Sequence, residues 1–199
     1  MIKLIVVFRR VWIRCIGQLA FAFIKLVNPG LKTAGSIKCK NIPQILILDG
    51  ASITLANQVV LNSANFGYHL SMYKPVKLFA EGAAAKITIG ANTRVNGSCI
   101  HARQLVSIGE NVLIGANSAI FDSNGHPLVM DSPHTRLTNT DEPRAVHIGD
   151  NVWLGAGVTV LPGTTIGSGS VIASGSVVRG NVPANCIFGG NPAQLIKQY

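Results

Sequence analysis

The chain has 199 residues, enough for one domain with an appendage and a sizeable core. Only 13% of the residues are charged, so part of the surface must be hidden in an oligomer or against a membrane. The formal net charge of +9 favours an anionic partner. Aromatic residues are 6% of the chain and do not interleave with a basic run, which argues against a nucleic-acid-binding protein.

The first thirty residues are predicted to form an amphipathic α-helix that ends at Asn28, Pro29 and Gly30. Steps of three and four residues place one stripe on this helix: Lys3, Val7, Arg10, Arg14, Gln18, Phe21 and Lys25. The remaining helix surface is almost wholly apolar. No uncharged run approaches the ~18–20 residues that a membrane-spanning helix needs.

Two interpretations of this helix stay open. In the first, residues 1–28 lie on the inner membrane surface near a lipid-linked substrate, and the protein is cytoplasmic and peripheral on that membrane face. In the second, the apolar face of the helix docks on its own domain or on a neighbouring subunit.

A six-residue repeat runs through the second half of the chain. From residue 148 it reads IGDNVW, LGAGVT, VLPGTT, IGSGSV, IASGSV and VRGNVP, and an aliphatic residue opens each block. The same phase appears upstream at Ile108, Ile114 and Ile120, and looser versions surround Ile89 and residues 46–61. This period does not suit an α-helix, but it suits short strands whose opening aliphatic residue points inward. Three blocks make one triangular turn of about 18 residues, and stacked turns pair ~4.8 Å apart.

The pattern predicts an all-β fold, a parallel β-helix over residues 31–199 that follows the helical residues 1–30. At residue 126 a histidine stands where the next opening aliphatic residue is due, and the repeat then stops for residues 127–146. A loop of this length inside a compact domain is usually functional. We therefore predict one extruded loop, with His126 replacing an interior aliphatic residue at its start.

These blocks resemble those of the hexapeptide-repeat acyltransferases, which form left-handed parallel β-helices. The run NVWLGAGVTVLPGTTIGSGSVIASGSVV, followed by VPANCIFGGNPAQLI, resembles in particular the maltose, galactoside and polysaccharide O-acetyltransferase branch. The resemblance is strong over residues 86–199 and weak over residues 45–85. It implies left-handed winding, a homotrimer with active sites between subunits, and acetyl-CoA as co-substrate without a required metal.

The resemblance also implies that His126, in the sequence GHP, is the catalytic general base. An imidazole with a pKa near 6.5 is suited to take a proton from a sugar hydroxyl at neutral pH. In the family the acceptor attacks the acetyl thioester directly, and the chain has no GxSxG nucleophile motif. Asp122 is the nearest carboxylate that could orient His126, and a backbone carbonyl would also fix the tautomer of the ring.

On the donor side, the resemblance assigns four residues to the reactive end of acetyl-CoA. Trp153 is expected to line the pantetheine channel, and the amide of Ala156 to hold the thioester carbonyl. Ser174 and Gly175 match the small residues that let the pantetheine arm lie against the turns of the β-helix.

The CoA phosphates and the acceptor are less well specified. Arg179 and Lys197 are the candidates for the phosphates, although the family often has Thr-Lys where this chain has Arg179-Gly180. Asn96 resembles the asparagine that contacts the acceptor sugar in related enzymes. Residues 62–80 are expected to form either a second acceptor wall or an irregular turn.

These features predict an acetyl-CoA-dependent O-acetyltransferase that modifies a sugar hydroxyl of a surface polysaccharide or of its lipid-linked precursor. An N-acetyltransferase acting on an amino sugar is the alternative, because the same base would serve. A non-catalytic β-helix scaffold would need neither His126 nor Trp153. A γ-class carbonic anhydrase would need three zinc-binding histidines, two of them five residues apart. The spacings of His101, His126, His134 and His147 contain no such pair.

The four cysteines are Cys15, Cys39, Cys99 and Cys186. They are widely spaced and form no CxxC pair, so a zinc site or a disulfide framework is the less favoured interpretation. We expect them to be small buried residues in a reducing compartment.

Overall fold

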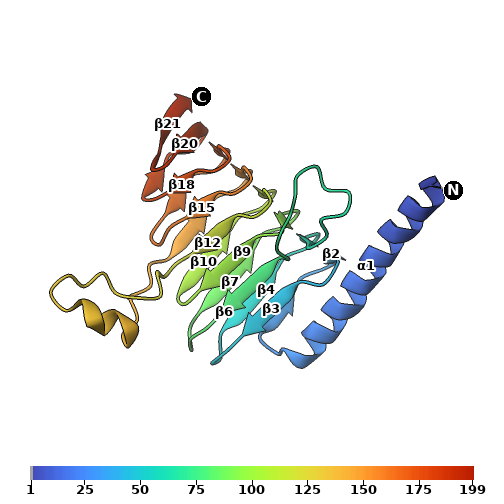
Figure 1. Ribbon diagram of the computed structural model, residues 1–199, viewed down its shortest axis with the longest axis horizontal. Coiled ribbons are helices and arrows are strands. Elements are labelled where there is room, and N and C mark those ends of the chain that lie inside the picture. The colour runs from blue at the N-terminus through green and yellow to red at the C-terminus, as the bar shows by residue number, and fades with distance from the viewer. Residues whose placement is uncertain (1) are drawn as a thin grey trace.

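The computed structural model describes residues 2–199, as one N-terminal helix followed by a stack of short strands (Figure 1). The strands form three sheets that wind around one interior. Successive strands of each sheet pair in parallel, except for one antiparallel pair at the C-terminal end. One coil is a set of three consecutive strands, one from each sheet. The fold is therefore all-β apart from the helix and a short 3₁₀ segment.

Apart from the last strand of the chain, each sheet takes every third strand in sequence order. Sheet A consists of β1 (Leu31–Thr33), β4 (Ser52–Leu55), β7 (Lys86–Ile89), β10 (Leu105–Ile108), β13 (Val146–Ile148), β16 (Thr165–Ile166) and β19 (Asn181–Val182). Sheet B consists of β2 (Lys38–Lys40), β5 (Val60–Asn62), β8 (Arg94–Asn96), β11 (Leu113–Ile114), β14 (Trp153–Leu154), β17 (Val171–Ile172), β20 (Cys186–Gly190) and β21 (Ala193–Gln198). Sheet C consists of β3 (Gln44–Ile47), β6 (Lys77–Ala80), β9 (Cys99–Ala102), β12 (Ala119–Phe121), β15 (Thr159–Val160) and β18 (Val177–Val178).

The interior is a set of aliphatic ladders. The predicted block openers Ile148, Leu154, Val160, Ile166, Ile172 and Val178 are all buried. The register pairs openers of successive coils, as in Ile114 with Leu154. Each such side chain, when fully buried, contributes roughly 1.5–3 kcal/mol of transfer free energy. The ladders therefore supply the main apolar stabilisation of the solenoid.

The corners between sheets explain the glycines and asparagines of the repeat. A Cβ atom on Gly115 would lie 2.6 Å from the amide nitrogen of Ala156 in the next coil. Two residues later, Asn117 has a φ angle of 63°, a left-handed conformation that asparagine tolerates better than most residues. The missing side chain at Gly115 lets successive coils stack closely, and the left-handed backbone at Asn117 turns the chain toward the next sheet.

The chain leaves the coils twice. Between β5 and β6, residues 63–76 form a loop above sheet B, and Asn117 holds it through the carbonyl of Ser71 and the amide of Tyr73. Between β12 and β13, residues 122–145 project from the body and contain the 3₁₀ helix η1 (Pro133–Leu137) (Figure 1). The sequence predicted a single excursion, and the structure has two.

Helix α1 (Ile2–Val27) packs on β2 through its C-terminal half. Phe21 is buried, and the Gln18 side chain bonds the carbonyl of Ile37 and the amide of Cys39. Gly17 permits this approach, since a Cβ atom there would lie 2.7 Å from the carbonyl oxygen of Cys39. Within residues 2–199, no helix is long and apolar enough to span a membrane.

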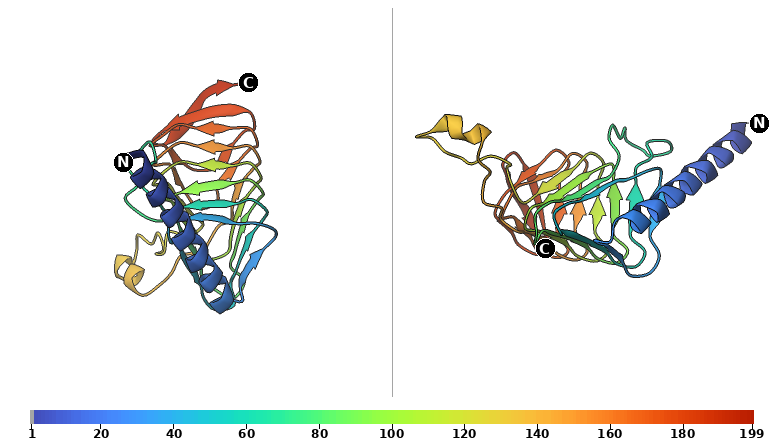
Figure 2. Two further views of the ribbon diagram at one scale, coloured as in Figure 1. Left: turned by 90° about the vertical axis from the view of Figure 1, so that its right-hand side faces the viewer. Right: turned by 90° about the horizontal axis from the view of Figure 1, so that it is seen from below.

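From Arg10 onward the predicted stripe of α1 faces the coils, whereas Val7 near its N-terminal end is exposed. Gln18 and Phe21 contact the coils, and Arg10 and Arg14 line pockets between the helix and the body. The large apolar side chains lie on the exposed side: Leu4, Ile5, Val7, Phe8, Val11, Trp12, Leu19, Phe23, Leu26 and Val27. The apolar face of α1 therefore does not dock on its own domain. Figure 2 shows α1 and residues 122–145 at opposite ends of the molecule.

Candidate active site

His126 lies at the start of the long excursion, and its side chain is exposed. It does not take an interior position, so the prediction that it replaces a core aliphatic residue is wrong. The six-residue phase ends at Ile120, because the chain leaves sheet C after Phe121. His126 is thereby free to reach a substrate outside the coil.

The ring of His126 is oriented by a backbone carbonyl. Its Nδ1 atom lies 2.6 Å from the carbonyl oxygen of Arg136, at the end of η1. A carbonyl oxygen only accepts, so Nδ1 must carry a hydrogen and the neutral ring presents an unprotonated Nε2. This is the tautomer that can accept a proton from a substrate hydroxyl.

The loop holds that carbonyl in place through its own contacts. The guanidinium of Arg136 donates to the carbonyl of Val129, and its Nη2 lies 3.4 Å from the sulfur of Met130. Thr135 donates its hydroxyl to the carbonyl of Ser132. These bonds fold the excursion on itself, which keeps the orienting carbonyl beside the His126 ring.

Asp122 serves the coil instead of the histidine. Its side chain is buried, and its two oxygens accept the amides of Arg103, Gln104 and Leu105 at 2.7–2.8 Å. These amides belong to the turn between β9 and β10. The prediction that Asp122 orients His126 is therefore wrong, and its carboxylate caps a turn of the preceding coil.

A second carboxylate, Asp141, ties the two ends of the excursion together. It accepts the hydroxyl of Ser123 at 2.5 Å and the amide of Asn124 at 2.6 Å. Burial alone would raise the pKa of Asp141, but the Ser123 hydroxyl, the amides of Asn124 and Gly125 and the charge of Arg103 together lower it. Asp141 therefore stays ionised and fixes the backbone directly before His126.

Sequence reasoning did not identify Asp141 or the carbonyl of Arg136. Both lie in the non-repetitive loop, where no period marks an inward or outward side. The only feature of the sequence that pointed toward Asp141 was its place in an acidic pair with Glu142. Nothing in the sequence links that pair to Ser123.

The predicted donor-side residues lie together on sheet B and at its corner with sheet C. Trp153 is 52% exposed on the outer face of β14. Ser174 and Gly175 are exposed at the corner after β17, and the amide of Gly175 donates to the carbonyl of Ala156. The corner therefore presents small residues beside an accessible indole ring.

The amide of Ala156 already has a partner in this chain. It donates to the hydroxyl of Ser174 at 3.2 Å, a long hydrogen bond. A thioester carbonyl would have to replace that hydroxyl. The roles of Ala156, Ser174 and Gly175 in acetyl-CoA binding remain predictions.

Arg179 and Lys197 are both exposed near the C-terminal end of the stack. Arg179 follows β18, and Lys197 lies in the terminal hairpin of β20 and β21 with its ammonium 4.4 Å from the ring centre of Tyr199. Neither belongs to an ion pair among the described residues. Their assignment to the CoA phosphates stays a prediction.

Asn96 lies on sheet B with a largely buried side chain. Its oxygen accepts from Asn62 at 3.0 Å, and its amide nitrogen donates to the carbonyl of Ile114 at 2.8 Å. Asn62 and Asn96 thus form a short amide ladder across β5 and β8. The ladder forms one wall of a pocket, which is compatible with the predicted contact to an acceptor.

The proposed base and the donor residues lie on different faces of one chain. The excursion that carries His126 leaves after sheet C and returns to sheet A. Trp153 lies on sheet B, in the coil that begins where the excursion ends. The excursion therefore links the coil of β10–β12 to the coil of β13–β15 that contains Trp153, and it leaves the stack on a different side from Trp153.

The cysteines do not form a common site. Cys39 and Cys186 are buried, Cys99 is half-buried and Cys15 is exposed, so the expectation of burial is wrong for Cys15. Burial raises the pKa of the Cys39 thiol to about 12, which keeps it protonated. Across residues 2–199, no cluster of three or more His, Cys, Asp or Glu side chains could hold a metal ion.

Comparisons with known proteins agree with this architecture. Residues 145–180 match the model of the bacterial transferase hexapeptide, and residues 105–125 match the hexapeptide repeat of succinyl-transferase. WbbJ of Escherichia coli K12, named as a lipopolysaccharide biosynthesis O-acetyl transferase, is 40% identical over 144 residues, 69% of this chain and 72% of WbbJ. A galactoside O-acetyltransferase of Lactococcus lactis is 41% identical over 45% of this chain and 42% of its own length.

A solved structure carries the donor molecule. The hexapeptide-repeat acetyltransferase VCA0836 of Vibrio cholerae, in complex with acetyl-CoA, is 33% identical, with a TM-score of 0.52 over 56% of this chain and 60% of its own. The galactoside acetyltransferase in complex with coenzyme A has a TM-score of 0.58 at 24% identity and supports the fold alone.

The stacked hexapeptide coils, together with these matches, define an acetyltransferase of the hexapeptide-repeat class. The chain belongs to the hexapeptide-repeat acetyltransferase family, and it is an acetyl-CoA-dependent O-acetyltransferase.

Replacing Asp122 by alanine should destabilise the fold, because it leaves the three amides of residues 103–105 without an acceptor. We expect a loss of about 2–4 kcal/mol in the free energy of unfolding. Urea denaturation measures it, with Asp131→Ala on the exposed loop as the matched control. Unchanged stability combined with lost turnover would restore the orienting role.

Asp141→Asn should loosen the base of the excursion and lower kcat roughly tenfold, because the backbone before His126 loses a charged acceptor. The KM for acetyl-CoA should stay unchanged. The folded pKa of Asp141 is lowered, so its stabilisation is complete above the ordinary value of about 4 and is lost as the pH falls through the folded value.

The difference in unfolding free energy between wild type and Asp141→Asn should therefore shrink in acid. Denaturation at pH 7 and pH 3 tests this, and Glu142→Gln, an exposed neighbouring residue, is the control. A difference that does not depend on pH would mean that the Asp141 charge is not involved.

Proposed function

We propose that the protein acetylates a sugar hydroxyl of a surface polysaccharide, or of its lipid-linked precursor, with His126 as general base. The observation that carries this proposal is the 2.6 Å contact between Nδ1 of His126 and the Arg136 carbonyl, which leaves Nε2 free to accept a proton. The similarity to WbbJ, which is named for lipopolysaccharide biosynthesis, supports the choice of a surface glycan as acceptor.

The reaction then needs no acyl-enzyme. Nε2 of His126 takes the hydroxyl proton while the oxygen attacks the thioester carbonyl carbon of acetyl-CoA. The tetrahedral intermediate collapses as the carbon–sulfur bond breaks, and the CoA sulfur receives the proton from the imidazolium. The amide of Ala156 would stabilise the oxyanion after exchanging its Ser174 partner.

Transfer to an amino sugar is the second candidate, because an amine could use the same base. Two relatives with O-acetyltransferase names favour the ester product. Mild alkali distinguishes the two chemically, since it removes an O-acetyl group and leaves an N-acetyl group in place.

The active site is proposed to form between subunits of a homotrimer with left-handed coils. His126 and Trp153 lie on different faces of one chain, close to the junction of two successive coils, so rotation about an axis along the stack can bring one chain's excursion to its neighbour's sheet B. The excursion exposes three apolar side chains that such a contact would cover: Leu128, Met130 and Leu137.

Helix α1 is proposed to lie on the inner membrane face, which would make the protein peripheral and cytoplasmic. Its exposed side carries large apolar residues, including Phe8 and Trp12, whose rings stack with centres 6.4 Å apart. An apolar helix face of this kind can insert at a headgroup boundary. This surface would bring a lipid-linked acceptor to the enzyme.

Mixing two defective variants tests both the general base and the shared site. His126→Ala should lower kcat by at least 10²-fold, and Trp153→Ala should raise the KM for acetyl-CoA. Assayed well below the raised KM, where both parents are nearly inactive, co-expressed variants should recover about a quarter of wild-type activity, because each mixed trimer contains one site with both native residues. Recovery no greater than either parent would place the site within one chain, and full activity of His126→Ala would reject the base.

Trp12→Glu and Phe8→Glu should release the protein from membranes, because charged groups oppose insertion of the helix face. Flotation with anionic vesicles measures the bound fraction, and acetyl-CoA binding should be unchanged. Leu137→Glu, on the distant excursion, is the matched control for lost apolar surface. Equal flotation of all variants would contradict the interfacial role of α1.

A further inference from the structure

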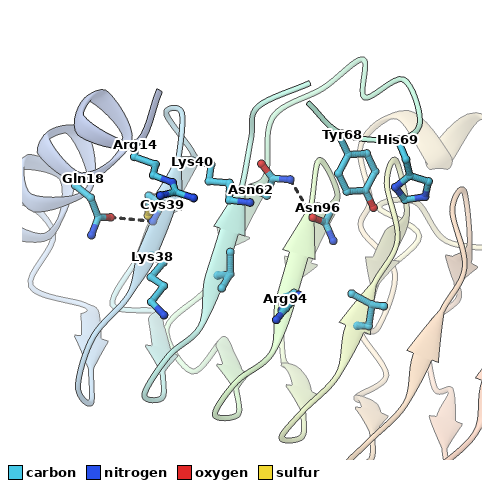
Figure 3. A pocket seen from close by; sticks show the side chains of 12 residues that line it. Arg14, Gln18, Lys38, Cys39, Lys40, Asn62, Tyr68, His69, Arg94 and Asn96 are labelled. Atoms are coloured by element: carbon cyan, nitrogen blue, oxygen red, sulfur yellow. Dashed lines mark hydrogen bonds between the residues drawn. The ribbon is translucent and has the colours of Figure 1, made fainter. Parts of the chain in front are cut away.

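A basic pocket lies between α1, the outer face of sheet B and the loop of residues 63–76 (Figure 3). Its volume is about 620 Å³, within the range of small-molecule binding sites. The helix contributes Arg14, the sheet contributes Lys38 and Arg94, and the loop contributes Tyr68 and His69. Three separate parts of the chain thus converge on one cavity.

The cations of this pocket have no acidic partners. Lys40 also lines the pocket, and Arg10 lies beside it in an adjoining hollow. Among the described residues, no aspartate or glutamate lines either hollow, and none of these arginines and lysines forms an ion pair. Burial, and then the charges of Arg14, Arg94 and Arg10, lower the pKa of Lys40. A bound anion would relieve this crowding of like charges.

One column of side chains on sheet B leads from the pocket toward Trp153. The register sets Lys38 beside Val60, Val60 beside Arg94, Arg94 beside Leu113, and Leu113 beside Trp153. Two coil steps, about 10 Å, separate Arg94 from Trp153. One hexose and its phosphate linkage can span that distance.

We propose that this pocket binds the diphosphate of a phosphorylated acceptor, so that the attached sugar lies along sheet B with its hydroxyl near Trp153. The inference rests on the proposed function, since it names a group of the same acceptor. A diphosphate fits better than a single carboxylate, because four cations lie around the cavity and Arg10 beside it. Tyr68 and His69 then cover the anion from the solvent side.

The diphosphate has two sources, a membrane lipid or a soluble nucleotide sugar. The exposed apolar side of α1 lies on the same helix as Arg14, which would let a lipid tail stay outside while its headgroup enters the pocket. Two probes separate the sources: a polyprenyl diphosphate hexose in vesicles and a uridine diphosphate hexose in solution.

The test compares wild type with the Lys38→Gln/Arg94→Gln variant. We expect affinity for the diphosphate probe to fall roughly tenfold or more, and the KM of the diphosphate acceptor to rise equally, with kcat unchanged. Lys86→Gln, an exposed lysine on sheet A, is the matched control and should bind like wild type. Calorimetry and initial rates supply the two readouts.

Four outcomes would overturn the inference. The first is that neither probe binds to the wild type, and the second is that Lys86→Gln loses as much affinity as the pocket variant. The third is that the KM of the pocket variant for acetyl-CoA rises in parallel with its KM for the diphosphate acceptor. The fourth is that an unphosphorylated glycan reacts as well as the diphosphate acceptor. A parallel rise in the KM for acetyl-CoA would mean that the pocket binds acetyl-CoA and not the acceptor. By contrast, diphosphate binding without acetyl transfer to any acceptor would reject the proposed function and leave the pocket intact.

Discussion

The constraint that governs this molecule is the close approach of backbones at the corners of successive coils. A Cβ atom at Gly115 would lie 2.6 Å from the Ala156 amide nitrogen, and one at Gly155 would lie equally close to the Ser174 amide nitrogen. At these two corners the coils can stack ~4.8 Å apart only because the residue after the inward aliphatic has no side chain. Other corners carry larger residues at the equivalent point, such as Leu161 and Arg179, so the inward aliphatic residues set the six-residue period and the glycines mark the closest backbone contacts.

This constraint also decides where polar chemistry can occur. The interior of each coil is filled by aliphatic ladders and by small hydroxyl residues whose side chains bond to the backbone, such as Ser118 and Thr164. A titratable group inside would interrupt a ladder. Groups that act on a substrate must therefore stand on outer faces, at corners or on excursions. The proposed base His126, Trp153 and the basic pocket all lie in such places.

The interior residues could be predicted from the repeat, because each six-residue block places its opening aliphatic residue inside the coil. This assignment needs no knowledge of contacts between distant parts of the chain. The same rule failed at His126, since a period cannot show where the chain leaves the stack. The chain departs four residues earlier, at Asp122, a buried carboxylate that caps the turn after β9. The Arg136 carbonyl and Asp141 were beyond prediction for a related reason, because their partners are set by the fold of the loop itself.

For helix α1 the sequence predicted the helical residues correctly, but the side of the helix that faces the domain is the reverse of the one that docking through the apolar face required. The docking interpretation placed the apolar face of the helix against the domain or a neighbouring subunit, but within this chain Gly17 and Gln18 contact β2, so the arginines on the same stripe as Gln18 turn toward sheet B. The positive charge of the helix is thereby concentrated in a cavity, and the apolar surface of the helix is exposed. An acceptor with an apolar anchor and an anionic linkage matches both sides of the helix at once, whereas an uncharged soluble sugar would use neither.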